Sequence, residues 1–427
     1  MGKRMNFIVL TVLVLVALLF GSEYKFVTGG GEIDSGDTAW MLISSAFVLL
    51  MTPGLAFFYG GMVSRKNVIS TLMQSFVALG VVSLIWVIVG FSIAFGDSIG
   101  GIFGNPFTYF NFRNVTLSPN PDFSSTIPFL LYALFQMKFA IITPALITGS
   151  FAERVRFRSY ILFVVLFTLF IYAPLAHMTW HPDGLLRNWG VLDFAGGTVV
   201  HMSAGFAALA GAFFLGKRKQ ESHEPANVPF IILGTGLLWF GWFGFNSGSA
   251  LGANEDAVIA FANTNLASAS AMITWIFLER FHNRKMSALG ACVGAIVGLV
   301  AITPAAGFVT LGQSIFIGFV AAITSNYAIR LKNKSDLDDT LDVFPSHGVG
   351  GMVGMILTAV FAKEVGLIYG HTSTFFYHII ALVIVAVFTF GGSWLLYYIV
   401  DILLPMRVTE SQEERGLDAS QHGETFV

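Results

Sequence analysis

The sequence predicts an all-α polytopic membrane protein with eleven transmembrane helices, arranged as a 5+5 inverted repeat plus one extra helix. Of its 427 residues, 55% are hydrophobic and 11% are charged, whereas a typical soluble domain carries about 25% charged residues. Apolar segments recur at the length that a bilayer requires, and basic residues gather in alternate connections. The formal net charge of -2 gives no polybasic surface, so nucleic acid is not expected as a partner.

Residues 1–22 are predicted to form a signal peptide. Lys3 and Arg4 precede an apolar core at about residues 7–20, which is short for a transmembrane span. No clear A-x-A cleavage site follows this core, so a short uncleaved anchor is the alternative. A transmembrane domain at 36–404 and a C-terminal tail at 405–427 complete the expected organisation.

Eleven apolar segments near the required length of about 20 residues follow the predicted signal peptide. Each must be helical, because lipid cannot satisfy an open backbone. The chain also has 45 glycines, which favours a tightly packed bundle in which backbones approach closely. The segments are centred near residues 49, 84, 138, 169, 206, 240, 268, 296, 321, 354 and 390.

Basic residues separate the connections into two classes. In the even-numbered connections the only basic residues are Arg113, Arg187 and Lys363. By the positive-inside rule the mature N-terminus lies outside and the C-terminus lies in the cytoplasm of a cell (inner) membrane. The odd-numbered connections and the tail carry Arg65, Lys66, Arg154, Arg156, Arg158, Lys217, Arg218, Lys219, Arg280, Arg284, Lys285, Arg330, Lys332, Lys334, Arg407 and Arg415.

Two pairs of similar segments predict the internal repeat. AIITPALI (140–147) lies in span 3 and VAITPAAG (300–307) lies in span 8. His201 in span 5 and His347 in span 10 are each followed by small residues four and seven positions later. Because both pairs are five spans apart, spans 1–5 and 6–10 are expected to be inverted repeats, which place a substrate path at their interface.

Histidines within spans are expensive to bury, and they suggest a functional site. His201 and His347 are therefore candidate partners on one axis, while neutral imidazoles bonded to neighbouring helices are the structural alternative. Two histidines without nearby acidic or cysteine ligands do not favour a metal site, and neither a metal nor a cofactor is expected. The single cysteine, Cys292, is interpreted as a small packing residue.

Asp193 lies eight residues before His201, where span 5 should begin. An aspartate there caps free N–H groups and interacts favourably with the helix dipole. A structural role for Asp193 is favoured over direct contact with the substrate, although an external carboxylate also attracts cations.

Aromatic residues gather towards the outer ends of spans 3, 4 and 6. Phe135 and Phe139 share a helix face at i, i+4, and Trp180 ends span 4. Such residues are usually core or interface anchors, yet an aromatic face with one hydroxyl acceptor suits a small desolvated cation. In span 6 the segment WFGWFGFNSGS contributes Trp239, Trp242, Phe245 and Ser249.

Several motifs together resemble the ammonium transporter family (Amt, related to the Rh proteins). They run in order from about residue 36 to the C-terminus: MTPGLAFFYGGMVSRKN, ITGSFAERVRF, HMTW, LDFAGGTVVH, GWFGFNSGS, SHGVGGMVG and GLDASQHGE. The resemblance implies a homotrimer with one pore in each protomer, and ammonium or ammonia as substrate.

The resemblance also assigns roles to individual residues. It implies an outer ammonium site at Trp180, Phe139 and Ser249, a phenyl gate of Phe139 and Phe245, and twin pore histidines at His201 and His347. Asp193 matches an aspartate near the outer site with a mainly structural and electrostatic role. Phe58 and Tyr59 match aromatics near the pore wall, beside the pore candidate Trp242.

A transport mechanism follows from this resemblance. Ammonium is recruited outside and deprotonated, ammonia crosses a hydrophobic pore, and the histidines offer a proton relay that would make transport electrogenic. ERGLDASQHGE (414–424) resembles a cytoplasmic regulatory tail against which a PII signalling protein can block the pores. Lys138 and HPDG at 181–184 depart from the pattern of some relatives.

Two other classes of function are alternatives to transport. An ammonium sensor of the same fold generally carries an extra signalling domain, and about 25 residues follow span 11 here. An intramembrane enzyme would need paired catalytic motifs such as HExxH. Transport is therefore expected, and enzymatic activity is not.

Overall fold

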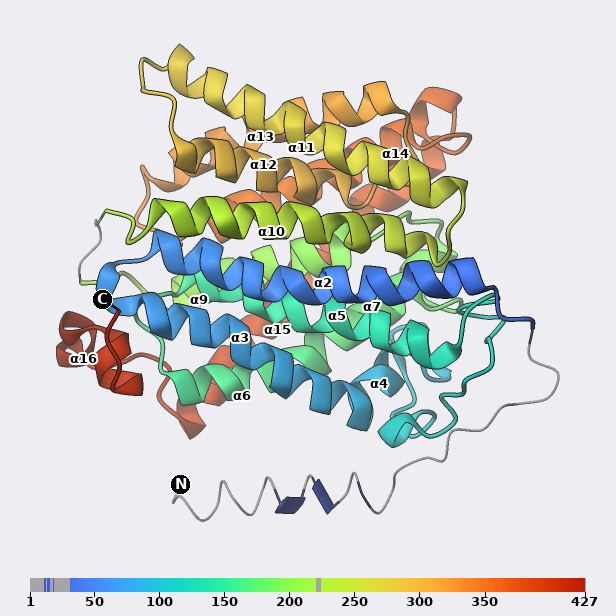
Figure 1. Cartoon of the computed structure of the whole chain (residues 1–427), viewed down its shortest axis with the longest axis horizontal. Helices are drawn as coiled ribbons and strands as arrows, with labels where there is room; N and C mark the ends of the chain where they lie inside the picture. Colours follow the sequence, from blue (N-terminus) through green and yellow to red (C-terminus); the bar gives the residue numbers. More distant parts are fainter. Residues whose placement is uncertain (1–10, 13, 16–17, 19–30, 220–223, 427) are drawn as a thin grey trace.

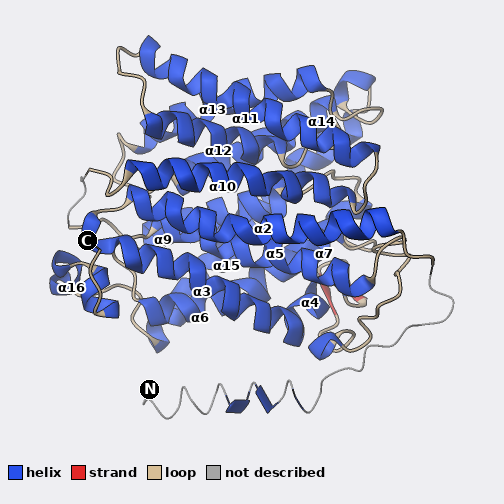
Figure 2. Cartoon of the chain, viewed as in Figure 1, coloured by secondary structure: helices blue, strands red, loops and turns tan. Residues whose placement is uncertain are grey.

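A computed structural model describes residues 31–219 and 224–426, together with residues 11, 12, 14, 15 and 18. Most of the predicted signal peptide at 1–22 lies outside the described residues. The described chain is a bundle of helices that run side by side along the long axis of the molecule (Figure 1). A two-residue pair of strands, β1 (Ser98–Ile99) and β2 (Phe103–Gly104), forms a small hairpin at one end of the bundle (Figure 2).

Eleven helical rods within the described residues correspond to the eleven predicted spans. They confirm the predicted all-α class. Four rods contain a π-helical turn, which lies within the second and fourth rods and at the start of the fifth and tenth. In order they are α2 (Ser35–Met62), α3 (Val68–Ile85) with η2 (Trp86–Gly90) and α4 (Phe91–Phe95), α5 (Phe129–Ile147), α6 (Phe157–Phe167) with η5 (Thr168–Tyr172) and α7 (Ala173–Trp180), η6 (Gly197–Met202) with α9 (Ser203–Leu215), α10 (Val228–Ser247), α11 (Glu255–Phe281), α12 (Ala288–Ile302), α13 (Leu311–Lys332), η8 (Phe344–Val349) with α14 (Gly350–Phe361), and α15 (Thr372–Leu403).

Shorter helices occupy the connections and the tail. They include α8 (Leu185–Asn188), α16 (Glu410–Arg415) and η10 (Asp418–His422), and the 3₁₀ turns are η1 (Arg65–Asn67), η3 (Phe110–Phe112), η4 (Thr148–Ser150), η7 (Gly248–Ala250) and η9 (Leu367–Tyr369).

The eighth rod is shorter than the sequence pattern suggests. Ten rods are long and apolar enough to cross a membrane, but α12 has 15 residues, or about 22 Å at 1.5 Å per residue. Pro304 follows its C-cap, Thr303, and proline has no N–H with which to continue a helix. The matching Pro144 remains inside α5, so the two TP motifs are not used identically.

Small residues let the helices approach closely, as the glycine content predicts. α2 packs along α10, where Gly234 lies against the backbone of Phe58. The two histidine-bearing rods cross at Gly205 and Gly348, and a Cβ atom at Gly205 would overlap the backbone of Gly348. This contact brings the fifth and tenth rods together at their histidines.

Candidate functional site

His201 and His347 occupy equivalent turns of the two crossing rods. His201 lies in the π-helical turn η6 and His347 in the π-helical turn η8, a local geometry that is often found at functional sites. Their Nδ1 atoms are 3.3 Å apart, and both residues are almost fully buried. The structure thus brings together the two histidines that the sequence pattern pairs.

Thr303 and Trp242 surround His201. His201 Nε2 lies 3.2 Å from Thr303 Oγ1, and Trp242 Nε1 donates to the same oxygen at 2.9 Å. The Trp242 ring stacks on His201 with centroids 5.4 Å apart. The sequence pattern identifies Trp242 but not Thr303, although Thr303 belongs to the TP motif that predicts the repeat.

The histidines line a small apolar cavity of about 10 Å³. That volume is at the lower limit for one molecule of the size of water. Hydrocarbon side chains make up most of its wall, so a charged occupant would find few partners. The lining residues are Met51, Leu55, Phe58, Ile142, Leu146, Val200, His201, Leu238, Trp242, Phe245, Ile296 and His347.

Two phenyl rings separate this cavity from a larger one. The rings of Phe139 and Phe245 have centroids 4.2 Å apart, and both side chains are buried. Phe245 also lies 6.0 Å from the His201 ring. Phe139 lines the larger cavity and Phe245 lines the smaller one, so the ring pair lies between them.

The larger cavity has a volume of about 250 Å³ and is partly open. Trp180, Phe139 and Ser249 line it, and Trp180 meets Phe139 edge-on at 5.9 Å. Ser249 Oγ donates its proton to the carbonyl of Phe245 at 2.8 Å, so its lone pairs remain available to accept a hydrogen bond. Asp122 and Arg187 add one charge of each sign to the wall.

Asp193 also lines the larger cavity, but its carboxylate already accepts hydrogen bonds from the protein itself. It accepts hydrogen bonds from the backbone N–H groups of Gly196, Gly197 and Thr198 at 2.8, 2.6 and 2.7 Å, and from the Thr198 hydroxyl. The Asp193 carbonyl accepts from Trp180 Nε1 at 3.0 Å. Asp193 therefore fixes the start of the His201 turn and the position of the Trp180 ring.

The remaining sequence candidates lie around these cavities. Phe58 lines the small cavity, whereas the neighbouring Tyr59 donates to the carbonyl of Leu146 and lies behind its wall. Lys138 is half-buried, and its Nζ lies 3.8 Å from Met137 Sδ. The 181–184 segment forms a turn that ends in Gly184, where a Cβ would overlap the carbonyls of the preceding helix.

A model of the Ammonium Transporter Family matches residues 39–427. The chain belongs to this family. It is 45% identical to an ammonium transporter of Aquifex aeolicus, over 99% of each chain. The structure is similar to Saccharomyces cerevisiae Mep2, with a TM-score of 0.85, 34% identity and 92% of each chain covered. It is also similar to a protein described as a sensor Amt protein, with a TM-score of 0.84 and 29% identity, over 91% of this chain and 98% of that one.

Asp339 is a second helix cap in the transporter that sequence reasoning missed. Its carboxylate accepts from Val343 N at 3.1 Å and Phe344 N at 2.7 Å, at the start of η8. It lies eight residues before His347, as Asp193 does before His201, so the internal repeat indicates the position of this second cap. Burial, followed by the neighbouring Asp342 charge, raises the pKa of Asp339 to about 6.

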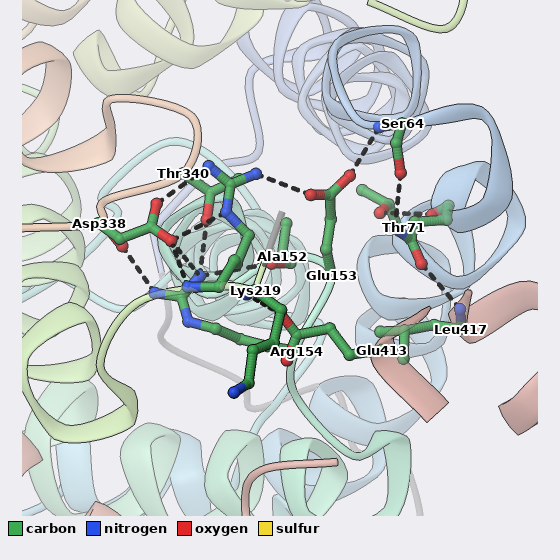
Figure 3. A network of polar contacts seen from close by, with 12 residues as sticks. Ser64, Thr71, Ala152, Glu153, Arg154, Lys219, Asp338, Thr340, Glu413 and Leu417 are labelled. Carbon is green, nitrogen blue, oxygen red and sulfur yellow. Dashed lines mark hydrogen bonds and ion pairs between the residues drawn. The ribbon is translucent and has the colours of Figure 1, made fainter. Parts of the chain in front are cut away.

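At the same end of the transporter, buried ion pairs join four connections (Figure 3). Arg218 binds both oxygens of Asp338 at 2.9 and 3.0 Å and Glu153 at 2.7 Å. Arg154 is fully buried and donates to the Asp338 carbonyl at 2.6 Å. Glu153 also accepts from Ser64 N at 2.6 Å. Burial raises the pKa of Asp338, but hydrogen bonds from Arg218 and the Arg154 charge outweigh this effect and lower it.

The C-terminal tail of the transporter is packed against these connections. Glu413 accepts from Lys219 N and pairs with Arg407 at 3.1 Å. Asp418 accepts from Ile69 N and Ser70 N at 3.1 and 2.7 Å, so it caps the start of α3. Sequence reasoning treated these charges as loop and tail charges and did not predict that they meet.

Proposed function

We propose that this family member conducts ammonia after recruiting and deprotonating the ammonium ion. The observation that carries the proposal is the order of three features along one axis. An open cavity with aromatic rings and a hydroxyl acceptor comes first, a closed ring pair follows, and a small apolar cavity with two joined histidines lies beyond it.

The outer cavity offers two kinds of contact to an ammonium ion. Trp180 and Phe139 can attract it through their ring faces, a contact worth about 0.5–2 kcal/mol. Ser249 can accept one of its N–H groups, because its own proton is donated to Phe245. Asp193 supports the site by holding the backbone and the Trp180 ring, and its charge favours a cation.

The small cavity discriminates against ions. Moving a bare ion from water into a medium of low dielectric costs on the order of 20 kcal/mol by the idealised Born estimate. Ammonium can avoid this cost by giving up a proton, whereas potassium cannot. Opening of the Phe139 and Phe245 rings would then admit neutral ammonia to the histidine-lined cavity.

The histidine pair supplies a relay for the released proton. Nδ1 atoms 3.3 Å apart can share a proton, and an imidazole can both accept and donate one. If the proton crosses with ammonia, transport carries one net charge for each nitrogen. We propose this electrogenic mode.

The proposed assembly is a homotrimer in a cell (inner) membrane with one pore in each protomer. The mature N-terminus faces outward, and the end that carries the ion-pair network and the tail faces the cytoplasm. This orientation is supported by the gathering of the basic connections at that end. A PII signalling protein is proposed as a partner of the same face.

An ammonium sensor is the second candidate function. It is favoured by the similarity to the structure described as a sensor Amt protein. In that case ammonium would occupy the outer cavity and change the tail contacts with little or no conduction.

Current recordings on supported membranes distinguish transport from sensing. Proteoliposomes should give a current and take up nitrogen after an ammonium jump, but not after a potassium jump, and liposomes without protein should give neither. The variant Trp180→Leu should need more ammonium for half-maximal current. Trp189→Leu is the matched control, because Trp189 packs on Tyr377 outside the cavity lining. An absence of both current and uptake with ammonium would overturn conduction in favour of sensing.

A further inference from the structure

The Thr303 hydroxyl uses its single proton in a hydrogen bond to a backbone carbonyl. Thr303 Oγ1 donates to the carbonyl of Leu299 at 2.8 Å. In a continuous helix the Val300 carbonyl would accept from the N–H of residue 304, but Pro304 has no N–H. The Thr303 N–H donates to the Val300 carbonyl instead, at 3.3 Å, so the Leu299 carbonyl has no backbone donor in the described part of the chain. The Thr303 hydroxyl supplies that missing hydrogen bond.

Thr303 Oγ1 must therefore act as the acceptor in its other two hydrogen bonds. Trp242 Nε1 can only donate, and it does so at 2.9 Å. His201 Nε2 is the remaining neighbour, at 3.2 Å. An oxygen that has given its only proton to Leu299 cannot donate to this nitrogen, so His201 Nε2 carries a proton.

One assigned proton determines the rest of the neutral pair. A neutral imidazole has one protonated nitrogen, so His201 Nδ1 is a bare acceptor. The 3.3 Å contact between the two Nδ1 atoms then requires the proton to be on His347 Nδ1. His347 Nε2 is left with a lone pair. Among the described residues it has no hydrogen-bond partner, and His347 lines the small cavity.

The repeat does not impose this arrangement on both histidines. Thr143 occupies the matching TP motif in α5, and its hydroxyl donates to Phe139 at 2.7 Å. Within the described chain Thr143 forms no bond to His347. The sequence is symmetric at this point, but only His201 is held by a threonine.

We propose that Thr303 is a positioning residue that makes the histidine pair unequal. It holds His201 with Nε2 protonated, so that the pair offers its one free lone pair at His347 Nε2. This inference rests on the proposed function and specifies which atom serves it. The N–H bond of ammonium breaks in the outer cavity and leaves ammonia, and when the released proton reaches the pair a new N–H bond forms at His347 Nε2. His347 becomes the imidazolium while His201 remains neutral.

Nitrogen NMR of ¹⁵N-histidine protein in lipid bilayers tests the assignment directly. The two pore histidines, assigned by difference with His201→Gln and His347→Gln, should show opposite tautomers in the wild type. His201 should be protonated at Nε2, and His347 at Nδ1. The opposite assignment, or the same tautomer in both rings, would overturn the inference.

Three variants separate positioning from simple packing. Thr303→Val should abolish the preference for the Nε2 tautomer at His201, Thr303→Ser should restore it, and the matched control Thr143→Val should leave it unchanged. A wild-type tautomer pattern in Thr303→Val would contradict the proposal, and the wild-type spectrum is decisive if that variant does not fold. Because the spectra need no transport, wrong tautomers with normal ammonium currents would refute this inference alone. Absent currents would refute the proposed function.

Discussion

Replacement of Asp193 by alanine should destabilise the protein rather than only weaken ammonium binding. The Asp193 carboxylate is 7% exposed and accepts from three backbone N–H groups and one hydroxyl. Each buried donor left without a partner costs about 1–3 kcal/mol. The three amides together imply a loss of about 3–9 kcal/mol, which is comparable with the whole stability of many proteins.

Thermal unfolding of the purified protein in detergent measures this loss. Asp193→Ala should melt several degrees below the wild type or fail to accumulate as folded protein. Asp193→Asn should be intermediate, since it keeps one acceptor oxygen without the charge. Asp183→Ala is the matched control, because that carboxylate lies in the adjacent turn and is 75% exposed. If Asp193→Ala melts like the wild type yet binds ammonium poorly, the capping account is wrong and direct contact replaces it.

Three further predictions concern the outer site, the second cap and the tail. Ser249→Ala should raise the ammonium concentration for half-maximal current by about tenfold, since one bond to a charged group is worth about 1.5 kcal/mol or more, and equal currents at all concentrations would exclude the hydroxyl from the site. Because the pKa of Asp339 is raised from 3.8 to about 6, its protonated form favours folding at low pH and this advantage is lost as the pH rises through about 6. Melting curves should show the wild type losing about 2 kcal/mol relative to Asp339→Asn between pH 4 and 7, and parallel curves would refute this. Glu413→Gln should release the tail from Lys219 and Arg407 and speed its limited proteolysis, whereas unchanged cleavage would show that other contacts hold it.

The sequence predicts most of the bundle and the positions of its two histidines. Span length and loop charge depend on the bilayer, which imposes the same requirement on every rod. The repeat then pairs His201 with His347 without knowledge of the packing. The same reasoning overestimates the eighth rod, because it counts apolar residues and gives too little weight to Pro304.

The unpredicted features depend on contacts between distant residues. The role of Thr303 arises only when its hydroxyl, the Leu299 carbonyl and His201 are seen together. Arg218 and Asp338 are 120 residues apart in sequence, and each has the character of an ordinary loop charge. Spacing identifies where a charged residue lies along a helix, but it does not identify its partner.

Selectivity of the histidine pair tests the central claim most directly. Ammonium and potassium currents should be recorded from the same proteoliposomes for the wild type and for the double variant His201→Asp with His347→Glu. The wild type should conduct with ammonium alone, because a dry cavity beside neutral imidazoles excludes an ion that cannot lose a proton. Carboxylates at both positions should offset the cost of desolvating a cation and admit potassium. Equal potassium and ammonium currents in the wild type, or unchanged selectivity in the double variant, would contradict conduction of ammonia past the histidines.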